Sequence, residues 1–395
     1  MTVKDKQVVQ QNEQTHAELD PLREGAFAIA TKELKGLLSQ SKQAFLIGAG
    51  CSKCAGLPLM DELTTKTLES IQNTDKAHAI LQGLQTQFTG GKGCTIEDYM
   101  SEIVDLISIA DRRDHRNAKG KEVPIGDKQY NVSELKDALS TIKLAISKTI
   151  SDCNLEIKHH QLFVRALHEQ LQSGKPGANR IVDYFILNYD TLIEDALSLE
   201  RIPLADGFSG GMTGWWNPST FDENFLRARV FKIHGSIDWC SFEDDLLPRR
   251  LRNNLKKLSS NDEPVLIWPA ATKYRESQRD PYAQLIERMR KILRPNQYEE
   301  LVLTVMGYSF GDSHINYEID RALKESEGRL TVIVFTEDEQ PKGLIENWID
   351  DPKTKEDVRI YSKNGFCHAD KAYESKDDLP WWKFEVLARI LGGEL

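Results

Sequence analysis

Residues 43–50 of the chain read QAFLIGAG, a short apolar run that stops at a glycine-alanine-glycine turn. Apolar residues recur at helical spacing before this run, over residues 22–39, and after it, over residues 59–71. The predicted local order is therefore helix, buried strand, glycine loop and helix. Such glycines let the backbone approach a pyrophosphate at a helix N-terminus, but they also serve close packing of backbones. A third glycine comes too late for the usual dinucleotide fingerprint, so both interpretations stay open.

Further short apolar runs follow in the second half of the chain, and helical patterns come after several of them. The runs lie at 182–187, 229–234, 265–268, 301–306 and 330–335, and the helical patterns at 191–199, 281–293 and 315–324. Alternating strands and helices predict a parallel sheet that is covered on both faces. We therefore expect an α/β fold with a doubly wound, Rossmann-like parallel sheet.

The region from 73 to 179 has a different pattern, with helical spacing and almost no strand signal. Thr95 and Asp98 form a capping-box pattern that opens a helix through Ile109. Ser133 is the expected cap of a second helix that runs to about Ile150, residues 155–171 form a third, and residues 111–130 read as a loop. We interpret this region as a large helical insertion or second lobe.

The chain is thus divided into four expected parts. They are a flexible N-terminal arm at 1–20, an α/β domain at 21–72 and 180–340, the helical insertion at 73–179, and a C-terminal extension at 341–395.

Composition excludes several classes of protein. The 395 residues carry 51 basic and 61 acidic side chains, a net charge of −10, so direct nucleic-acid binding is not expected. No apolar run approaches the roughly 18–20 residues that span a bilayer, and the polar start lacks a secretory signal. Six cysteines are too few for a disulfide scaffold, so we expect a cytoplasmic protein without membrane contact.

Polar or glycine residues follow four of the predicted strands. Asn188 and Asp190 follow the second, His234 and Gly235 the third, and Gly307 the fifth. Each has a simple structural explanation as a helix cap, a hydrogen-bonded histidine or a turn. In doubly wound sheets, however, ligands bind outside the carboxyl ends of the strands, so these residues are expected to converge on one crevice.

Taken in order, these residues resemble the NAD-binding motifs of sirtuins. The motif G-A-G-x-S-x-x-x-G-[IL]-P lies at Gly48–Pro58, Asn-x-Asp at Asn188–Asp190, His-Gly at His234–Gly235 and Gly-x-Ser at Gly307–Ser309. One such motif is a weak signal, whereas the ordered set of four is a strong one. The resemblance covers about 22–72 and 180–340 and leaves the helical region unexplained.

The chain also departs from sirtuin deacylases. Cys51 and Cys54 form the only CxxC pair, so the four-cysteine zinc module of deacylases is missing and no metal is expected. The Phe-Arg that follows the first motif in deacylases is replaced within Leu59–Asp61.

The chain looks more similar to the sirtuin-like NAD-hydrolysing effectors of bacterial antiviral defence. Within that group it resembles most the subunit that works with a HerA-type hexameric ATPase. This likeness rests on Gly207–Gly210, Lys232–Ser236, Lys273-Tyr274, Gly307–Asp312 and His314–Asn316. It implies a homo-oligomer, a HerA-type partner, and activity that is gated by oligomerisation or by that partner.

The resemblance further implies that NAD+ is the substrate and is cleaved to nicotinamide and ADP-ribose. Asn188 would orient the ribose or a water, Asp190 would bind the carboxamide and stabilise the developing cation, and His234 would act as general base. The implied cofactor-binding residues are Gly48, Ala49, Gly50 and Ser52 at the phosphates, Gly56 and Leu57 in the same motif, and Gly307 and Ser309 at the adenosine.

Two other functions remain as alternatives. The first is NAD-dependent protein deacylation or ADP-ribosyl transfer, against which the missing zinc module and Phe-Arg count. The second is a non-catalytic sensor of NAD or ADP-ribose, which would need neither Asn188 nor His234.

Overall fold

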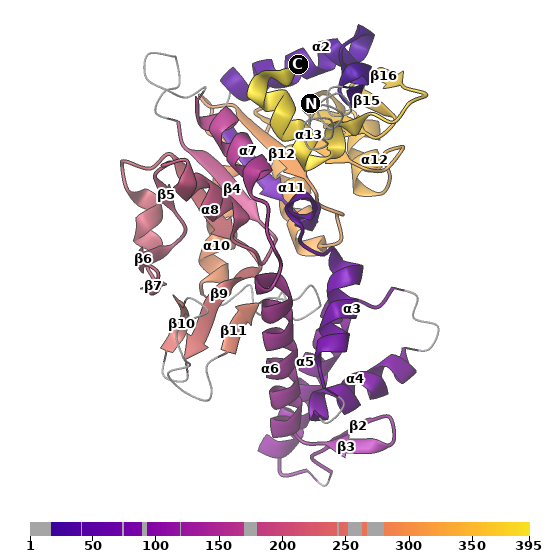
Figure 1. Cartoon of the computed structure of the whole chain (residues 1–395), viewed down its shortest axis with the longest axis vertical. Helices are drawn as coiled ribbons and strands as arrows, with labels where there is room; N and C mark the ends of the chain where they lie inside the picture. The colour runs from indigo at the N-terminus through magenta and orange to yellow at the C-terminus, as the bar shows by residue number, and fades with distance from the viewer. Residues whose placement is uncertain are drawn as a thin grey trace, which may run out of the picture.

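The computed structural model describes residues 17–40, 42–72, 75–88, 93–118, 120–169, 180–242, 245–251, 263–266 and 280–395. Figure 1 shows a large sheet with flanking helices and, below it, a lobe built mostly of helices. We call the second part the helical lobe. It consists of α3 (Met60–Ser70), α4 (Lys76–Gln87), α5 (Ile96–His115), β2 (Val123–Ile125), β3 (Lys128–Tyr130) and α6 (Val132–Ser151).

In the described part of the chain, nine strands form the large sheet, in the order β16-β15-β14-β13-β12-β1-β4-β8-β5. Their bounds are β1 Lys42–Ile47, β4 Val182–Ile186, β5 Leu204–Ala205, β8 Ala228–Lys232, β12 Leu301–Met306, β13 Leu330–Thr336, β14 Val358–Ser362, β15 Gly365–His368 and β16 Lys371–Glu374. All neighbours are parallel except the pairs made by β15 and β16. The central run β8-β4-β1-β12-β13-β14 has the Rossmann strand order 3-2-1-4-5-6. The predicted doubly wound parallel sheet is confirmed.

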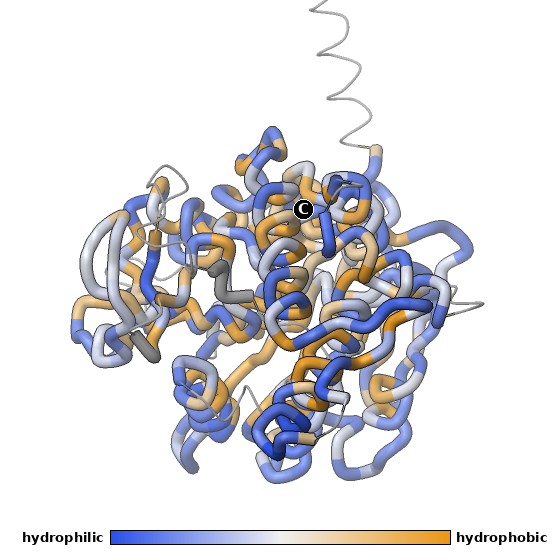
Figure 2. Tube along the Cα trace, turned by 90° about the horizontal axis from the view of Figure 1, so that it is seen from below, coloured by the Kyte–Doolittle hydropathy of each residue, from blue (hydrophilic) through white to orange (hydrophobic). Residues whose placement is uncertain are grey.

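Helices cover both faces of this sheet because successive strand residues point to opposite sides. Phe45 belongs to one buried cluster and its neighbour Leu46 to the other. The first cluster includes residues of α2 (Gly25–Gln40), α7 (Lys158–Glu169), α8 (Leu192–Leu199) and α13 (Phe384–Arg389), and the second includes residues of α10 (Tyr282–Ile292), α11 (Ser313–Glu325) and α12 (Leu344–Asp350). Hydrophobic segments accordingly lie inside the molecule and hydrophilic ones around its rim (Figure 2).

A second, antiparallel sheet lies beside the carboxyl ends of the parallel strands. Its order is β11-β9-β10-β7-β6, with β6 at Phe208–Gly210, β7 at Gly214–Trp216, β9 at Gly235–Phe242, β10 at Asp245–Arg250 and β11 at Glu263–Leu266. The apolar run at 265–268 was expected in the parallel sheet, and this prediction is wrong, because β11 pairs antiparallel with β9. A short apolar run identifies a buried strand but not the strand that it pairs with.

The helical lobe confirms some local predictions and corrects others. The capping box of Thr95 and Asp98 is present. The second helix is capped by Asn131, together with Glu134, and not by Ser133. The expected loop at 111–130 instead contains the end of α5 and the β2–β3 hairpin, whose three-residue strands are too short to give a periodic signal.

The predicted part boundaries remain predictions, and packing contacts cross several of them. Phe163 of α7, inside the expected insertion at 73–179, packs in the core of the large sheet. Strand β14, inside the expected extension at 341–395, pairs with β13. Residues 1–16 of the expected arm lie outside the described residues, whereas Leu19 is fully buried.

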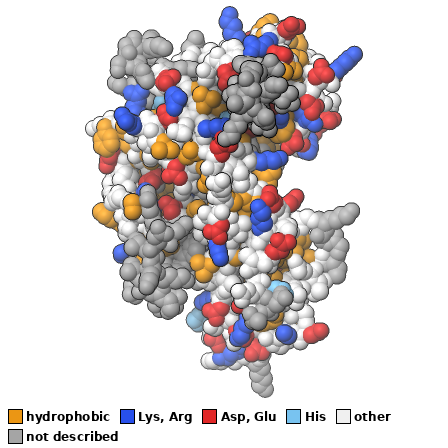
Figure 3. Space-filling model, viewed as in Figure 1, with side chains coloured by type: hydrophobic (Ala, Val, Ile, Leu, Met, Phe, Trp, Pro, Cys, Tyr) orange, Lys and Arg blue, Asp and Glu red, His pale blue; other side chains and the backbone are white. Residues whose placement is uncertain are grey.

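The visible surface carries acidic and basic side chains interspersed over both parts of the molecule (Figure 3). Among the described helices, none combines the length and apolar character needed to span a bilayer.

Candidate functional site

Four neighbouring parallel strands, β8, β4, β1 and β12, end level with one another. They include β1 and β12, between which the strand order of the sheet reverses. Ile47 of β1 is in register with Ile186 of β4 and Met306 of β12, and Ile186 with Lys232 of β8. The loops after β1, β4, β8 and β12 therefore start at the same edge. The crevice outside the carboxyl ends at the switch point is where doubly wound sheets bind ligands. This is the candidate site.

The glycine loops after β1 and β12 pack backbone against backbone. A Cβ on Gly48 would lie 2.3 Å from the Gly307 carbonyl oxygen, and one on Gly307 would lie 2.5 Å from the Cys51 nitrogen. Gly307 also has φ +61°, and its carbonyl accepts a hydrogen bond of 2.9 Å from the Gly50 N–H. Close packing thus accounts for these glycines, and it holds the start of a 3₁₀ helix, Ala49–Ala55, against the end of β12.

Three predicted side chains from the first two strand ends form one buried hydrogen-bonded group. The Asn188 Nδ2 donates to the Ser52 Oγ over 2.7 Å, and the Ser52 hydroxyl donates to the Asp190 Oδ2 over 2.7 Å. Asp190 Oδ1 accepts from the Leu192 N–H at 3.1 Å, so this residue also supports the start of α8. Exposed fractions are 3% for Ser52 and 7% for both Asn188 and Asp190. We call these three residues the Ser52 cluster.

The Ser52 cluster has one unsatisfied atom. Within the described residues, the buried Asn188 Oδ1 has no hydrogen-bond partner. Such orphaned acceptors are rare in folded proteins because an unpaired buried polar atom costs about 1–3 kcal/mol. A ligand hydroxyl or a water that donates to Oδ1 would remove this cost.

His234 follows β8, next to the end of β4, and is buried with 5% exposure. Its ring centroid lies 5.7 Å from that of His314, which belongs to α11 after the Gly307 loop. Ser236 anchors this corner through a hydrogen bond of 3.3 Å from its hydroxyl to the Tyr189 carbonyl. The ends of β4, β8 and β12 are therefore joined around one edge.

A buried pair of charges lies beneath the Ser52 cluster. Lys232, which is 1% exposed, donates from Nζ to the backbone carbonyl of Asp190 and lies 3.6 Å from the Glu194 Oε1. Burial raises the pKa of Glu194 to about 7, although Lys232 opposes the shift. The Asp190 backbone is thereby tied to β8 and to α8.

Two further contacts from outside the sheet reach residues next to the Ser52 cluster. His160 of α7 lies behind the glycine loop, and burial lowers its pKa to about 4, although the charge of Asp190 and a hydrogen bond to the Cys51 backbone oppose this. The Tyr189 hydroxyl donates to Glu97 Oε1 of the helical lobe over 2.9 Å. The helical lobe thus contacts the residue between Asn188 and Asp190.

The other residues of the sirtuin-like motifs lie around the glycine loop without joining the cluster. Gly56 ends the 3₁₀ helix with φ +94°, and Leu57 packs in the core of the helical lobe. Ala49 and Ser309 are exposed. Their expected contacts with NAD+ stay predictions.

Sequence reasoning gave no role to Lys232, Glu194 or His160. The one signal in the sequence was Lys232 itself, which lies within the apolar run 229–234. A lysine in a buried strand needs a hydrogen-bond or ion-pair partner. The burial of Glu194 and His160 depends on tertiary packing and left no local trace. In the described part of the chain, no group of three or more histidine, cysteine or acidic residues could hold a metal ion.

Comparison with known proteins gives one domain match. Residues 183–360 match the model of the SIR2-like domain, a range that contains all but the first residue of β4, together with β8 and β12, but not the glycine loop after β1. A search of curated proteins finds no match.

Solved structures give weaker likenesses. A Sir2 homologue mutant in complex with ADP-ribose is 12% identical, with 92% of this chain and 96% of that chain covered and a TM-score of 0.39. A Sir2 homologue in complex with NAD is 13% identical, with 92% and 93% covered and a TM-score of 0.39. The domain match thus covers the part of the chain that supplies Asn188, Asp190, His234 and Gly307.

Proposed function

We propose that the chain is an NAD+ glycohydrolase that cleaves NAD+ to nicotinamide and ADP-ribose in the crevice around the Ser52 cluster. The observation that carries the proposal is the buried, unpartnered Asn188 Oδ1, held beside Asp190 and near the end of the strand that bears His234. The SIR2-like domain match and the sirtuin-like order of motifs support NAD+ as the substrate.

The reaction exchanges one bond for another at the anomeric carbon of the nicotinamide ribose. The bond from that carbon to the nicotinamide nitrogen breaks, and its electron pair leaves with neutral nicotinamide. The oxygen of a water forms the new bond, and a proton of that water passes to His234 and then to solvent. As in glycoside hydrolysis, the carbon resembles an oxocarbenium ion in the transition state.

The residues of the cluster have distinct roles in this scheme. Asn188 accepts a hydrogen bond at Oδ1 from the ribose or from the attacking water and so fixes its position. The Asp190 carboxylate stabilises the developing positive charge. Ser52 acts as a positioning residue because its hydroxyl joins the Asn188 amide to the Asp190 carboxylate.

We further propose, from the resemblance, that this activity serves antiphage defence in the cytoplasm and is gated by homo-oligomerisation or by a HerA-type ATPase. Exposed apolar residues on the described surface suit such contacts. Trp215 is 57% exposed, Met212 59% and Phe225 66%.

The test is to incubate the purified chain with NAD+, without any acylated peptide, and to follow both products by chromatography. We expect equal amounts of nicotinamide and ADP-ribose from the wild type and from His115→Ala, a control at an exposed histidine whose side chain is 81% accessible. We expect a loss of about 100-fold or more with His234→Ala, since general-base catalysis contributes roughly 10²–10⁴-fold.

If the isolated chain is inactive, the same assay is repeated with a HerA-type ATPase. Activity gained in the mixture and lost with His234→Ala would support a gated hydrolase. Nicotinamide release that requires an acylated peptide would replace the proposal with deacylation. NAD+ binding without turnover under every condition would replace it with a sensor.

A further inference from the structure

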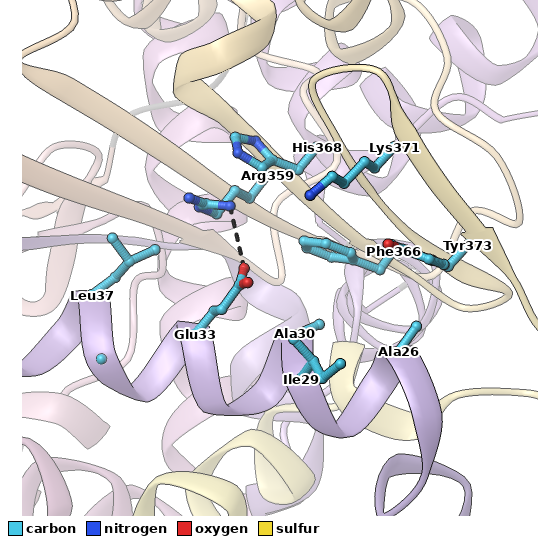
Figure 4. A pocket seen from close by; sticks show the side chains of 11 residues that line it. Ala26, Ile29, Ala30, Glu33, Leu37, Arg359, Phe366, His368, Lys371 and Tyr373 are labelled. Atoms are coloured by element: carbon cyan, nitrogen blue, oxygen red, sulfur yellow. Dashed lines mark ion pairs between the residues drawn. The ribbon is translucent and has the colours of Figure 1, made fainter.

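A cavity lies at the edge of the large sheet, between α2 and the strands β14, β15 and β16. Its volume is about 550 Å³, which is within the range of small-molecule sites. The helix contributes one wall and the strands the other (Figure 4). The lining residues are Ala26, Ile29, Ala30, Glu33, Gly36, Leu37, Arg359, Phe366, His368, Lys371 and Tyr373.

One end of this cavity is cationic. The side chains of Arg359, His368 and Lys371 come from three neighbouring strands and point toward the same space (Figure 4). Lys371 has no ion-pair partner among the described residues. Arg359 meets Glu33 only at 3.7 Å, and its Nε and Nη1 have no hydrogen-bond partner in the described part of the chain. Two fixed cations thus face a single carboxylate, with donors left for an anion.

The other end is apolar and aromatic. Tyr373 is 40% exposed and Ile29 61%, although both line the cavity. The rings of Phe366 and Tyr373 are nearly parallel, with an interplanar angle of 13° and centroids 6.4 Å apart. Exposed apolar and aromatic groups beside a cationic end suit a ligand with an anionic group and a flat ring.

The cavity is separate from the catalytic crevice. Arg359 is the second residue of β14, near the amino end of that strand, whereas the crevice lies at the carboxyl ends. In the sheet order, β13 and β12 separate β14 from β1, which places the two sites roughly 15 Å apart sideways at about 4.8 Å per strand.

We propose that this cavity binds a small phosphate ester with a planar ring, of the size of a nucleoside monophosphate. The phosphate is held by Arg359 and Lys371. The His368 Nδ1 donates to the Val358 carbonyl at 3.0 Å, so in the neutral ring Nε2 is an acceptor and makes no hydrogen bond to a phosphate oxygen. The ring lies against Tyr373 and Ile29. The proposal does not depend on NAD+ hydrolysis in the crevice.

The test is calorimetric titration of the whole chain with adenosine monophosphate in a phosphate-free buffer. Adenosine alone and inorganic phosphate are titrated in parallel. We expect adenosine monophosphate to bind at least about tenfold more tightly than either part, because each end of the cavity contributes.

Variants assign the binding to this cavity. We expect Lys371→Ala to weaken binding about tenfold and Lys371→Arg to restore it, as for one charge-assisted contact. Lys376→Ala, an exposed lysine outside the lining, is the matched control and should bind like the wild type. Arg359→Met should weaken binding further, with its melting curve recorded to show that it folds.

Binding that is unchanged by both Lys371→Ala and Arg359→Met would place the nucleotide elsewhere and overturn the proposal. Inorganic phosphate that binds as tightly as adenosine monophosphate would show that the ligand's ring makes no contact with Tyr373 and Ile29. If the wild type bound none of these ligands, both the phosphate site and the ring site would be ruled out.

Discussion

The amino and carboxyl ends of the β4–β8 strand pair differ in whether their buried polar groups have hydrogen-bond partners within the fold. At the amino end, Arg229 donates from Nε and Nη2 to the two carboxylate oxygens of Asp183, over 2.6 and 2.9 Å. At the carboxyl end, Lys232 binds the Asp190 carbonyl, and the Glu194 Oε2 has no hydrogen-bond partner among the described residues. The Asn188 Oδ1 beside them is unpartnered too.

We infer from this difference that the buried polar groups at the amino end stabilise the fold, whereas those at the carboxyl end bind a ligand. The Arg229–Asp183 pair is complete within the fold, so it needs nothing further. Burial raises the pKa of a carboxyl group at both ends, that of Asp183 at the amino end and that of Glu194, to about 7, at the carboxyl end. The carboxyl end differs in that two acceptors, the Asn188 Oδ1 and the Glu194 Oε2, have no hydrogen-bond partner among the described residues. Perturbed and unsatisfied groups cluster where a protein handles a ligand. The comparison predicts that substitutions at the amino end change stability, and those at the carboxyl end change activity.

The largest stability effect is expected at the amino end. Arg229→Ala leaves the fully buried Asp183 without its partner and should lower the free energy of unfolding by about 3–5 kcal/mol. Urea denaturation measures this, and the double variant Arg229→Met/Asp183→Leu should recover most of the loss. A single variant as stable as the wild type would contradict the structural role of the pair.

Glu194→Gln tests how the buried carboxyl group at the carboxyl end makes the free energy of unfolding depend on pH. Burial raises the pKa of Glu194 from 4.5 to about 7, so the folded chain keeps this proton where the unfolded chain releases it. Wild-type stability should therefore be highest below pH 4.5 and fall by about 3 kcal/mol as the pH rises to 7, relative to Glu194→Gln. Urea denaturation of both proteins at several pH values measures the difference. Equal slopes would show that this carboxyl group ionises normally.

Ser52→Ala is expected to change both stability and activity, because Ser52 stabilises the fold and positions the side chains of Asn188 and Asp190. Its loss leaves the Asn188 Nδ2 and the Asp190 Oδ2 without their shared partner, which should cost about 1–3 kcal/mol. Nicotinamide release should fall up to about 100-fold, because a misplaced group loses that much. Ser39→Ala, at an exposed serine on α2, is the control for both measurements. An active Ser52→Ala would remove Ser52 from the site.

Much of the large sheet could be predicted from the sequence. Apolar runs such as 43–47 and 301–306 are long enough to identify β1 and β12, and the intervening helices imply parallel order. The second sheet could not be predicted, since β6 and β7 span three residues each, too few for a periodic signal, and β7 pairs on its other side with β10, which lies far along the chain.

The position of the candidate site at one edge of the sheet could be predicted, but the hydrogen bonds within it could not. Asn188, Asp190 and His234 each follow a strand, so their common edge follows from the parallel order. That Ser52 lies between Asn188 and Asp190 depends on how the 3₁₀ helix at Ala49–Ala55 turns back over β4. That Lys232 contacts the Asp190 carbonyl and Glu194 depends on how α8 packs beside β8, and no spacing rule reveals these partners.

Nicotinamide release and the free energy of unfolding, measured together for Asn188→Ala and Arg229→Ala, separate the roles of the two strand ends. We expect Asn188→Ala to lose about 100-fold or more in activity while its stability stays within about 1 kcal/mol of the wild type. Arg229→Ala should show the reverse, with reduced stability and normal activity per folded molecule. Nicotinamide release by Asn188→Ala at the wild-type rate would exclude a catalytic role for Asn188.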